Sequence, residues 1–264
     1  MNTIILPEEK KENQIYYLSG LDCFNMLEQT YIETRQKEGR LYPNGMLAQL
    51  PLTGKDHPLY YEWRIREASM KALVKYLATY KELEIIDLGC GNGWLANQLS
   101  SKTENNVYAV DINKHELEQG AKVFSGNKRL KFVFADIFEN ILPKDSFDAI
   151  IISSAIQYFE EPALLIERLL NLLKITGEIH IIDSNFYKYR ELRGAGYRTK
   201  LYYKNLGHPE MAQFYHHHCW NELDGFNFQI LNKSNFKIGR LINKIFHINH
   251  SPFPWIRIKV QDNF

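Results

Sequence analysis

The stretch that decides the fold runs from residue 85 to residue 94 and reads Ile85-Ile86-Asp87-Leu88-Gly89-Cys90-Gly91-Asn92-Gly93-Trp94. It begins as an apolar run, passes through a turn with glycine at every second position, and continues with helical spacing. Glycine accepts positive φ and lets a ligand approach the backbone without meeting a Cβ atom. The free N–H groups of the following helix point toward a bound molecule. The stretch therefore predicts a strand, a nucleoside-binding turn and a helix.

Runs of strand length alternate with helix-length segments on both sides of this turn. The runs are rich in Val, Ile and Phe, the residues that favour strands. Five strands alternating with helices predict a mostly parallel sheet with helices on both faces. The expected strands are Glu84–Leu88, Val107–Val110, Leu130–Phe134, Phe147–Ile152 and Glu178–Ile182, and the helices between them include His115–Phe124 and Pro162–Leu173.

The two flanks of this core have a different pattern. Residues 1–83 predict a helical cap, with helices over Leu21–Gln36 and Tyr60–Tyr80, ahead of a core over residues 84–264. After the fifth strand come a Tyr- and Arg-rich insertion at residues 185–208 and an expected helix over Glu210–Asp224. The last two runs, Phe226–Leu231 and Trp255–Val260, are expected to pair as antiparallel edge strands, which gives a sheet of seven strands with an antiparallel last strand.

Composition narrows the class of protein. The chain has 264 residues, of which 45% are hydrophobic, enough for one domain with a sizeable core. Its formal charge of +1 gives no general attraction to polyanions, although Lys188 to Lys204 holds six basic residues and one acid. No run has the length of a membrane helix and the start does not fit a secretion signal, so we expect a soluble, cytoplasmic protein without membrane contacts. Cys23, Cys90 and Cys219 are expected to be reduced thiols.

Two glycine fingerprints compete for the turn. Nicotinamide dinucleotide proteins use G-x-G-x-x-G/A, whose third small residue would fall at Trp94, and a bulky indole conflicts with the close packing needed there. Asp87 followed by Gly89, Gly91 and Gly93 instead resembles the D-x-G-x-G-x-G motif of the class I S-adenosylmethionine-dependent methyltransferases, in their small-molecule branch. The resemblance continues from Glu84 to Asp183 and is weak outside it. It implies a Rossmann-like sheet.

The resemblance also implies roles for individual residues. Asp111, at the tip of the second strand, is the expected ligand of the two ribose hydroxyls, because a carboxylate accepts both hydrogen bonds. Asp136 is expected at the adenine amino group, with Ile137 and Ile112 on the faces of the ring. Arg64, in the helix before the first strand, is expected at the methionine carboxylate. The full expected set for S-adenosylmethionine is Arg64, Asp87, Gly89, Cys90, Gly91, Gly93, Asp111, Ile112, Asp136, Ile137 and Ser153.

The residues that act on the acceptor are less defined by the sequence. Methyl transfer needs a general base only when the acceptor carries a proton. Many relatives of the small-molecule branch have a histidine near the end of the fourth strand, where this chain has Gln157-Tyr158 instead. The candidates for a base are Tyr158, His216 and His217. No metal is expected, because the consecutive histidines from His216 to His218 would point about 100° apart on a helix and could not converge on one ion.

Several interpretations stay open. The leading hypothesis is a methyltransferase acting on a small molecule, because no nucleic-acid-binding domain is visible and no nucleic-acid partner is expected. Methylation of RNA or protein is an alternative that would use the basic stretches, and a non-catalytic S-adenosylmethionine-binding protein is another. The insertion at residues 185–208 is either a substrate lid, suited to an anionic or aromatic acceptor, or a structural cap on the sheet.

Overall fold

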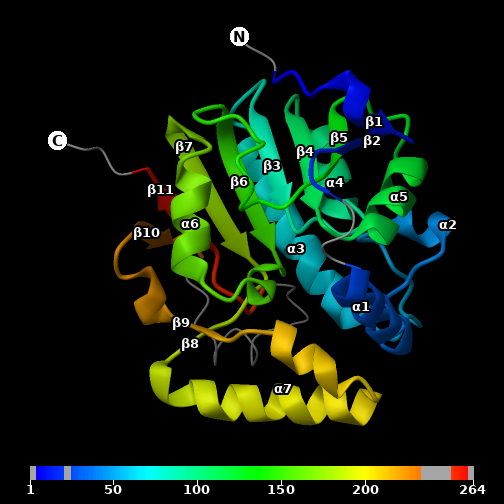
Figure 1. The fold of residues 1–264 in the computed structure, drawn as a ribbon, viewed down its shortest axis with the longest axis vertical. Helices are drawn as coiled ribbons and strands as arrows, with labels where there is room; N and C mark the ends of the chain where they lie inside the picture. Colours follow the sequence, from blue (N-terminus) through cyan, green and yellow to red (C-terminus); the bar gives the residue numbers. More distant parts are fainter. Residues whose placement is uncertain (1–3, 21–24, 233–250, 261–264) are drawn as a thin grey trace.

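The centre of the molecule is a single twisted sheet. The computed structural model describes residues 4–20, 25–232 and 251–260. Within these residues nine strands form the sheet, in the order β1-β2-β5-β4-β3-β6-β7-β11-β10 (Figure 1). The strands are β1 (Lys11–Glu12), β2 (Ile15–Tyr17), β3 (Glu84–Leu88), β4 (Asn106–Asp111), β5 (Leu130–Phe134), β6 (Phe147–Ser153), β7 (Leu173–Ile182), β10 (Asn227–Ile230) and β11 (Ile256–Lys259).

The pairing confirms the mostly parallel arrangement. Strands β2, β5, β4, β3, β6 and β7 pair in parallel, each with its neighbour. Strand β11 pairs antiparallel with β7, and β10 pairs antiparallel with β11, as expected for the last two strands. All seven strands expected from the sequence are present. The carboxyl ends of β3, β4, β5 and β6 therefore meet at one edge, where an open α/β sheet binds its ligands.

Helices cover both faces of the sheet, so alternate side chains of each strand enter two separate apolar clusters. Ile85 packs with helices α3, α4 and α5, whereas Ile86 packs with α6 on the other face. This alternation follows from the two-residue period of a strand. The helices on these faces are α3 (Tyr60–Leu77), α4 (Trp94–Lys102), α5 (Lys114–Val123) and α6 (Pro162–Leu170).

The N-terminal segment contributes strands as well as the expected helices. Helices α1 (Asn25–Lys37), α2 (Asn44–Leu47) and α3 confirm helical structure there, while residues 21–24 of the first expected helix lie outside the described residues. The sheet has nine strands among the described residues rather than the seven expected, because the N-terminal segment adds β1 and β2, and β2 pairs in parallel with β5, with Ile15 opposite Phe132. A strand of three residues is too short to show a two-residue period in the sequence.

The segment after β7 contains a second correction. The insertion forms β8 (Phe186–Tyr187) and helix α7 (Leu192–Leu206), which lies beyond the carboxyl ends of the strands, at the bottom of Figure 1. The expected helix over Glu210–Asp224 is wrong: the chain forms a 3-10 helix at Pro209–Phe214, strand β9 (His218–Cys219) and another 3-10 helix at Trp220–Leu223. Strand β9 pairs with β8, so a tertiary contact decides the local structure.

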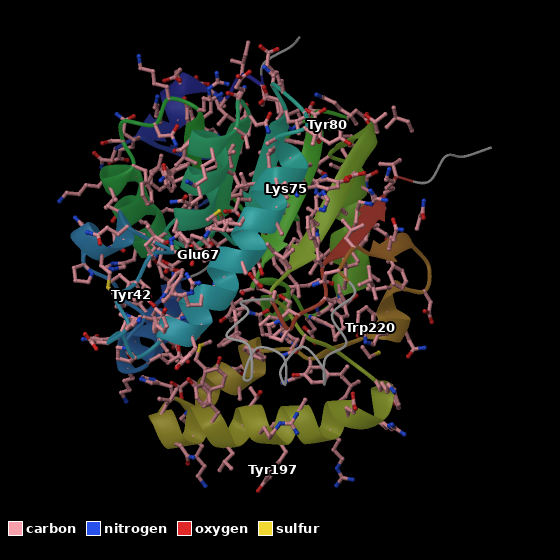
Figure 2. The ribbon with its side chains drawn as sticks, turned by 180° about the vertical axis from the view of Figure 1, so that it is seen from behind. Tyr42, Glu67, Lys75, Tyr80, Tyr197 and Trp220 are labelled. Carbon is pink, nitrogen blue, oxygen red and sulfur yellow. The ribbon has the colours of Figure 1, made fainter. Side chains whose placement is uncertain are left out.

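Two further findings concern the surface and the thiols. No helix of the described part is long and apolar enough to cross a membrane. Cys90 and Cys219 are buried and form no disulfide with each other. Figure 2 shows Tyr197 pointing from α7 away from the rest of the molecule.

Candidate functional site

The glycine turn has the left-handed backbone that its sequence indicates. Gly89, Gly91 and Gly93 have φ values of +68°, +55° and +72°. A Cβ atom on Gly89 would lie 2.5 Å from the Ala155 Cβ, and one on Gly93 would lie 2.5 Å from the Phe132 ring. Neither space admits a side chain, because real Cβ atoms do not approach so closely. The turn is therefore fixed by contacts with β5 and with the loop after β6.

Buried carboxylates surround this turn. Asp87 is 1% exposed, and among the described residues its Oδ2 has no hydrogen-bond partner. Burial, with a smaller contribution from Asp111, raises the pKa of Asp87 to about 8. Burial likewise raises the pKa of Glu116 to about 7, with Asp111 as the second cause. A cationic ligand would relieve this cost, because an opposite charge stabilises an ionised carboxylate.

Asp111 supports the turn directly. Its Oδ2 accepts a hydrogen bond of 2.7 Å from the Gly91 N–H, and its Oδ1 accepts one of 2.8 Å from the Asn113 N–H. Burial raises the pKa of Asp111, and these backbone hydrogen bonds oppose the rise. The carboxylate thus positions the glycine turn and also faces the first cavity.

The first cavity, of about 330 Å³, lies at the carboxyl ends of β3 to β6. Six of the eleven residues expected to bind S-adenosylmethionine line it: Gly89, Gly91, Asp111, Ile112, Asp136 and Ile137. Residues separated by almost 50 positions in sequence meet there because the strands are parallel. These six residues therefore share one cavity, with carboxylates and branched apolar side chains on its walls.

The other five expected residues do not line this cavity. Asp87, Cys90 and Gly93 are buried, and Gly93 is the N-terminal cap of α4. Ser153 ends β6, and its neighbour Ser154 lines the cavity instead. The guanidinium of Arg64 donates a hydrogen bond of 2.5 Å to Glu67.

Sequence reasoning missed several residues of the first cavity. Glu28 and Tyr31 come from α1, and Glu28 also accepts a hydrogen bond of 2.8 Å from the His115 N–H at the start of α5. No local motif marks them, because only the tertiary structure brings α1 to this edge. The remaining lining residues are Leu88, Asn113, Glu116, Ala135, Phe138, Ser154, Ala155, Tyr158 and Phe159.

A second cavity, of about 590 Å³, adjoins the first and shares Ser154 and Tyr158 with it. Helix α7 and the segment of residues 215–217 form its far wall. Tyrosines and arginines dominate its surface. Its lining comprises Arg35, Glu38, Arg40, Tyr61, Glu62, Ile65, Arg66, Ser154, Gln157, Tyr158, Asp183, Ser184, Asn185, Tyr187, Ala195, Arg198, Thr199, Tyr202, Tyr203, Tyr215, His216, His217 and Phe253.

Tyr158 stands between the two cavities. Its hydroxyl accepts a short hydrogen bond from the Arg35 guanidinium, and its ring packs edge-on against Tyr31, with centroids 5.7 Å apart. Burial raises the pKa of Tyr158, so the hydroxyl is protonated at neutral pH. Tyr158 can therefore shape the junction of the cavities but is a poor general base.

The three consecutive histidines have three different environments. His218 is buried, with Nε2 3.0 Å from the Ile156 carbonyl oxygen, and has a structural position. His216 and His217 line the second cavity, and His217 Nε2 lies 2.9 Å from Thr199 Oγ1 on α7. The expectation of a helix surface for these residues was wrong, because the segment is extended and enters β9. Among the described residues no group of three His, Cys, Asp or Glu side chains could hold a metal ion.

Burial also sets the protonation of His217. It lowers the pKa of this imidazole, and the neighbouring His218, Arg198 and His216 lower it further. The ring lies between those of Tyr187 and Tyr215, at centroid distances of 5.6 and 5.3 Å. His217 is thus neutral at pH 7 and can accept a proton.

The family follows from comparison with known proteins. A family model described as a methyltransferase domain matches residues 80–241, more than half of the chain. The chain therefore belongs to the methyltransferase-domain family, among the class I S-adenosylmethionine-dependent enzymes. The expected fold class and cofactor are confirmed.

Individual relatives match only part of the chain. The chain is 32% identical over 97 residues to a malonyl-[acyl-carrier protein] O-methyltransferase of Halalkalibacterium halodurans, covering 35% of this chain and 36% of that protein. It is 31% identical over 121 residues to a demethylmenaquinone methyltransferase of Clavibacter sepedonicus, covering 46% of each. The YcgJ protein of Bacillus subtilis has a similar fold, with a TM-score of 0.55 at 16% identity over 74% of this chain and all of that one. The matches thus span less than half of the two curated relatives.

The residues present fit S-adenosylmethionine. The unpartnered Asp87 oxygen, the glycine turn and the acidic first cavity suit a cationic nucleoside. Phe138 and Phe159, whose ring centroids lie 6.3 Å apart, add flat apolar surface to the same cavity. The chemistry of these walls agrees with the family.

Proposed function

We propose that the protein transfers a methyl group from S-adenosylmethionine to a small-molecule acceptor. The observation that carries the proposal is the junction of the two cavities at Ser154 and Tyr158. A donor in the first cavity and an acceptor in the second would meet there, and alignment of the two is the main requirement of a direct displacement. The second cavity has the volume of a typical small-molecule site.

The first cavity supplies the cofactor contacts in this proposal. Asp111 holds the ribose hydroxyls, Asp136 holds the adenine amino group, and Ile112 and Ile137 pack against the ring. Asp87 lies buried beneath the turn, and a bound cation would favour its ionised form. When bound, S-adenosylmethionine supplies a methyl group that is already activated on a sulfonium.

His217 is our candidate for the general base toward an acceptor hydroxyl. If Nε2 donates its hydrogen bond to Thr199 Oγ1, Nδ1 keeps a free lone pair. That nitrogen then takes the acceptor proton as the oxygen becomes methylated. His216 and Tyr158 are weaker candidates, because the Tyr158 hydroxyl is protonated and bonded to Arg35.

The insertion at residues 185–208 is the wall of the acceptor site in this proposal, rather than a cap alone. Tyr187 on β8 and Ala195, Arg198 and Tyr203 on α7 line the second cavity. Figure 1 shows α7 lying across the strand ends, where it would enclose a small acceptor.

The test uses the purified full chain and S-adenosylmethionine with a labelled methyl group. Incubation with a cell extract, followed by separation into small molecules, RNA and protein, should place the label in the small-molecule fraction. Calorimetry with S-adenosylhomocysteine, the product, should show binding.

Other outcomes discriminate the alternatives. Label in RNA, or in protein, would replace the small-molecule acceptor with that polymer. Binding of S-adenosylhomocysteine without label in any fraction would indicate a cofactor-binding protein that is not an enzyme. Failure to bind either cofactor form would reject the proposal.

A further inference from the structure

Arginine charge is in excess over carboxylate charge in the second cavity. Four arginines line it against three carboxylates, Glu38, Glu62 and Asp183. Burial raises the pKa of Asp183, whose Oδ1 accepts hydrogen bonds from the Ser69 and Ser251 hydroxyls, so this group tends toward its neutral form. The cavity is therefore positive even when every carboxylate is ionised.

Three of the arginines are engaged by glutamates. Arg35 donates to Glu38 at 2.6 Å, and Arg40 makes a bidentate pair with Glu62 at 2.6 and 2.7 Å. Arg66 lies 3.1 Å from the same Glu62. These pairs are partly buried, and a ligand that broke them would leave a charge without its partner. These three arginines are therefore already paired and are not available as an anion site.

Arg198 differs from the other three. Among the described residues no carboxylate forms an ion pair with it, although it lines the cavity from α7. Tyr187 lines the same cavity from β8. His217, the candidate base, lines this cavity as well.

We propose that the methyl acceptor carries a carboxylate or phosphate group, and that Arg198 binds this group in the second cavity. The inference rests on the proposed function, because it names the acceptor class of the same site. A guanidinium presents paired N–H donors that match the two oxygens of such a group. The nearby tyrosine rings, Tyr187 and Tyr215 among them, suit an aromatic body for the acceptor.

The test compares three ligands of the same shape on the full chain loaded with S-adenosylhomocysteine. They are 4-hydroxybenzoate, 4-hydroxyphenyl phosphate and the uncharged 4-hydroxybenzamide. At least one anion should bind about 10-fold or more tighter than the amide by calorimetry, as expected for one charge-assisted pair. The tighter anion identifies which group the site prefers.

Variants assign the preference to one residue. Arg198→Gln should remove the preference for the anion, Arg198→Lys should keep part of it, and Arg193→Gln, on the same helix but outside the cavity lining, should leave it unchanged. Equal binding of the amide, no binding of any ligand, or a preference that survives in Arg198→Gln would overturn the inference.

The same titrations on the protein without cofactor separate this inference from the proposed function. Arg198 does not line the first cavity, so the preference for the anions should persist in the protein without cofactor. A protein that prefers the anions but does not bind S-adenosylhomocysteine would contradict the proposed function and leave the anion site standing.

Discussion

In the proposed function, binding of a cationic nucleoside depends on the buried carboxylates around the glycine turn. Asp87 has a solvent exposure of 1% and a pKa raised to about 8, mainly by burial. An ionised carboxylate without a partner is costly in a protein interior. The protein without its ligand therefore carries a cost that a bound cation would remove.

Replacing Asp87 with asparagine tests this cost. The folded-state pKa of Asp87 lies above its unfolded value of about 3.9, so wild-type stability is lost as pH rises through the folded pKa of about 8. Without cofactor, the Tm of Asp87→Asn relative to that of the wild type should rise by roughly a few degrees between pH 5 and pH 9. Thermal unfolding across this range measures the difference, and a difference independent of pH would contradict it.

Cofactor affinity should respond in the opposite sense to the same substitution. Asp87→Asn removes a negative charge next to the turn, so binding of S-adenosylmethionine should weaken by about 10-fold or more. Calorimetry at pH 8 provides the measurement, and Asp145→Asn, at a distant loop, is the control. Unchanged affinity would remove Asp87 from the cofactor site.

His217 gives a prediction on rate. His217→Gln should lower methylation of an O–H acceptor by about 100-fold at pH 7, in the range typical of a lost general base. In the wild type the rate should fall only at a pH below the ordinary imidazole pKa of about 6.5, because burial lowers the pKa of His217 and protonation abolishes its basicity. The exposed His115→Gln serves as control, and a pH profile that His217→Gln leaves unchanged would exclude this role.

At the scale of the element, the turn between β3 and α4 is held by its neighbours as much as by its own sequence. Gly89 combines a positive φ with a Cβ position 2.5 Å from the Ala155 Cβ. The loop after β6 therefore constrains the turn after β3. This contact also fixes the positions of Gly89 and Ala155, which both line the first cavity.

A pair of alanine substitutions measures that constraint. Gly89→Ala should cost about 2 to 4 kcal/mol of stability, from the left-handed backbone and the displacement of Ala155. Gly126→Ala should change stability by less than about 0.5 kcal/mol, because a Cβ there meets nothing within 4 Å and its φ is not positive. Urea unfolding compares them, and equal effects would show that the turn is not constrained in this way.

At the scale of the whole molecule, the N-terminal residues belong to the core. Strand β2 extends the sheet beyond β5, and Ile15 is fully buried in the cluster that includes α4 and α5. This N-terminal segment therefore contributes directly to the sheet and its core. Removing them would expose the edge of β5.

Two isoleucines of this segment form a matched test. Ile15→Ala should destabilise the protein by about 2 to 5 kcal/mol, as expected for a large core side chain. Ile5, which is 92% exposed, should tolerate alanine with little change. Chemical unfolding of both variants gives the answer, and similar stabilities would place β2 outside the core.

The chemistry-bearing positions of the first cavity could be predicted because they follow strands. Asp111 and Asp136 end buried runs whose period and composition are visible in the sequence, and parallel strands bring such ends together. Glu28 and Tyr31 could not be predicted, because α1 reaches the cavity through the path of the chain. The sequence does not distinguish Arg198 from the other basic residues of the insertion, because only the tertiary structure places it on the cavity wall.

The sequence by itself determined the glycine turn, the alternation of strands and helices, and hence the family and its nucleoside, since these depend on local backbone geometry and short periods. Only the tertiary structure decided that β2 joins the sheet, that residues 216–218 are extended rather than helical, and that α7 walls a second cavity. Each of these depends on contacts between segments far apart in the chain, whose free energy outweighs local preference and leaves no periodic trace in the sequence.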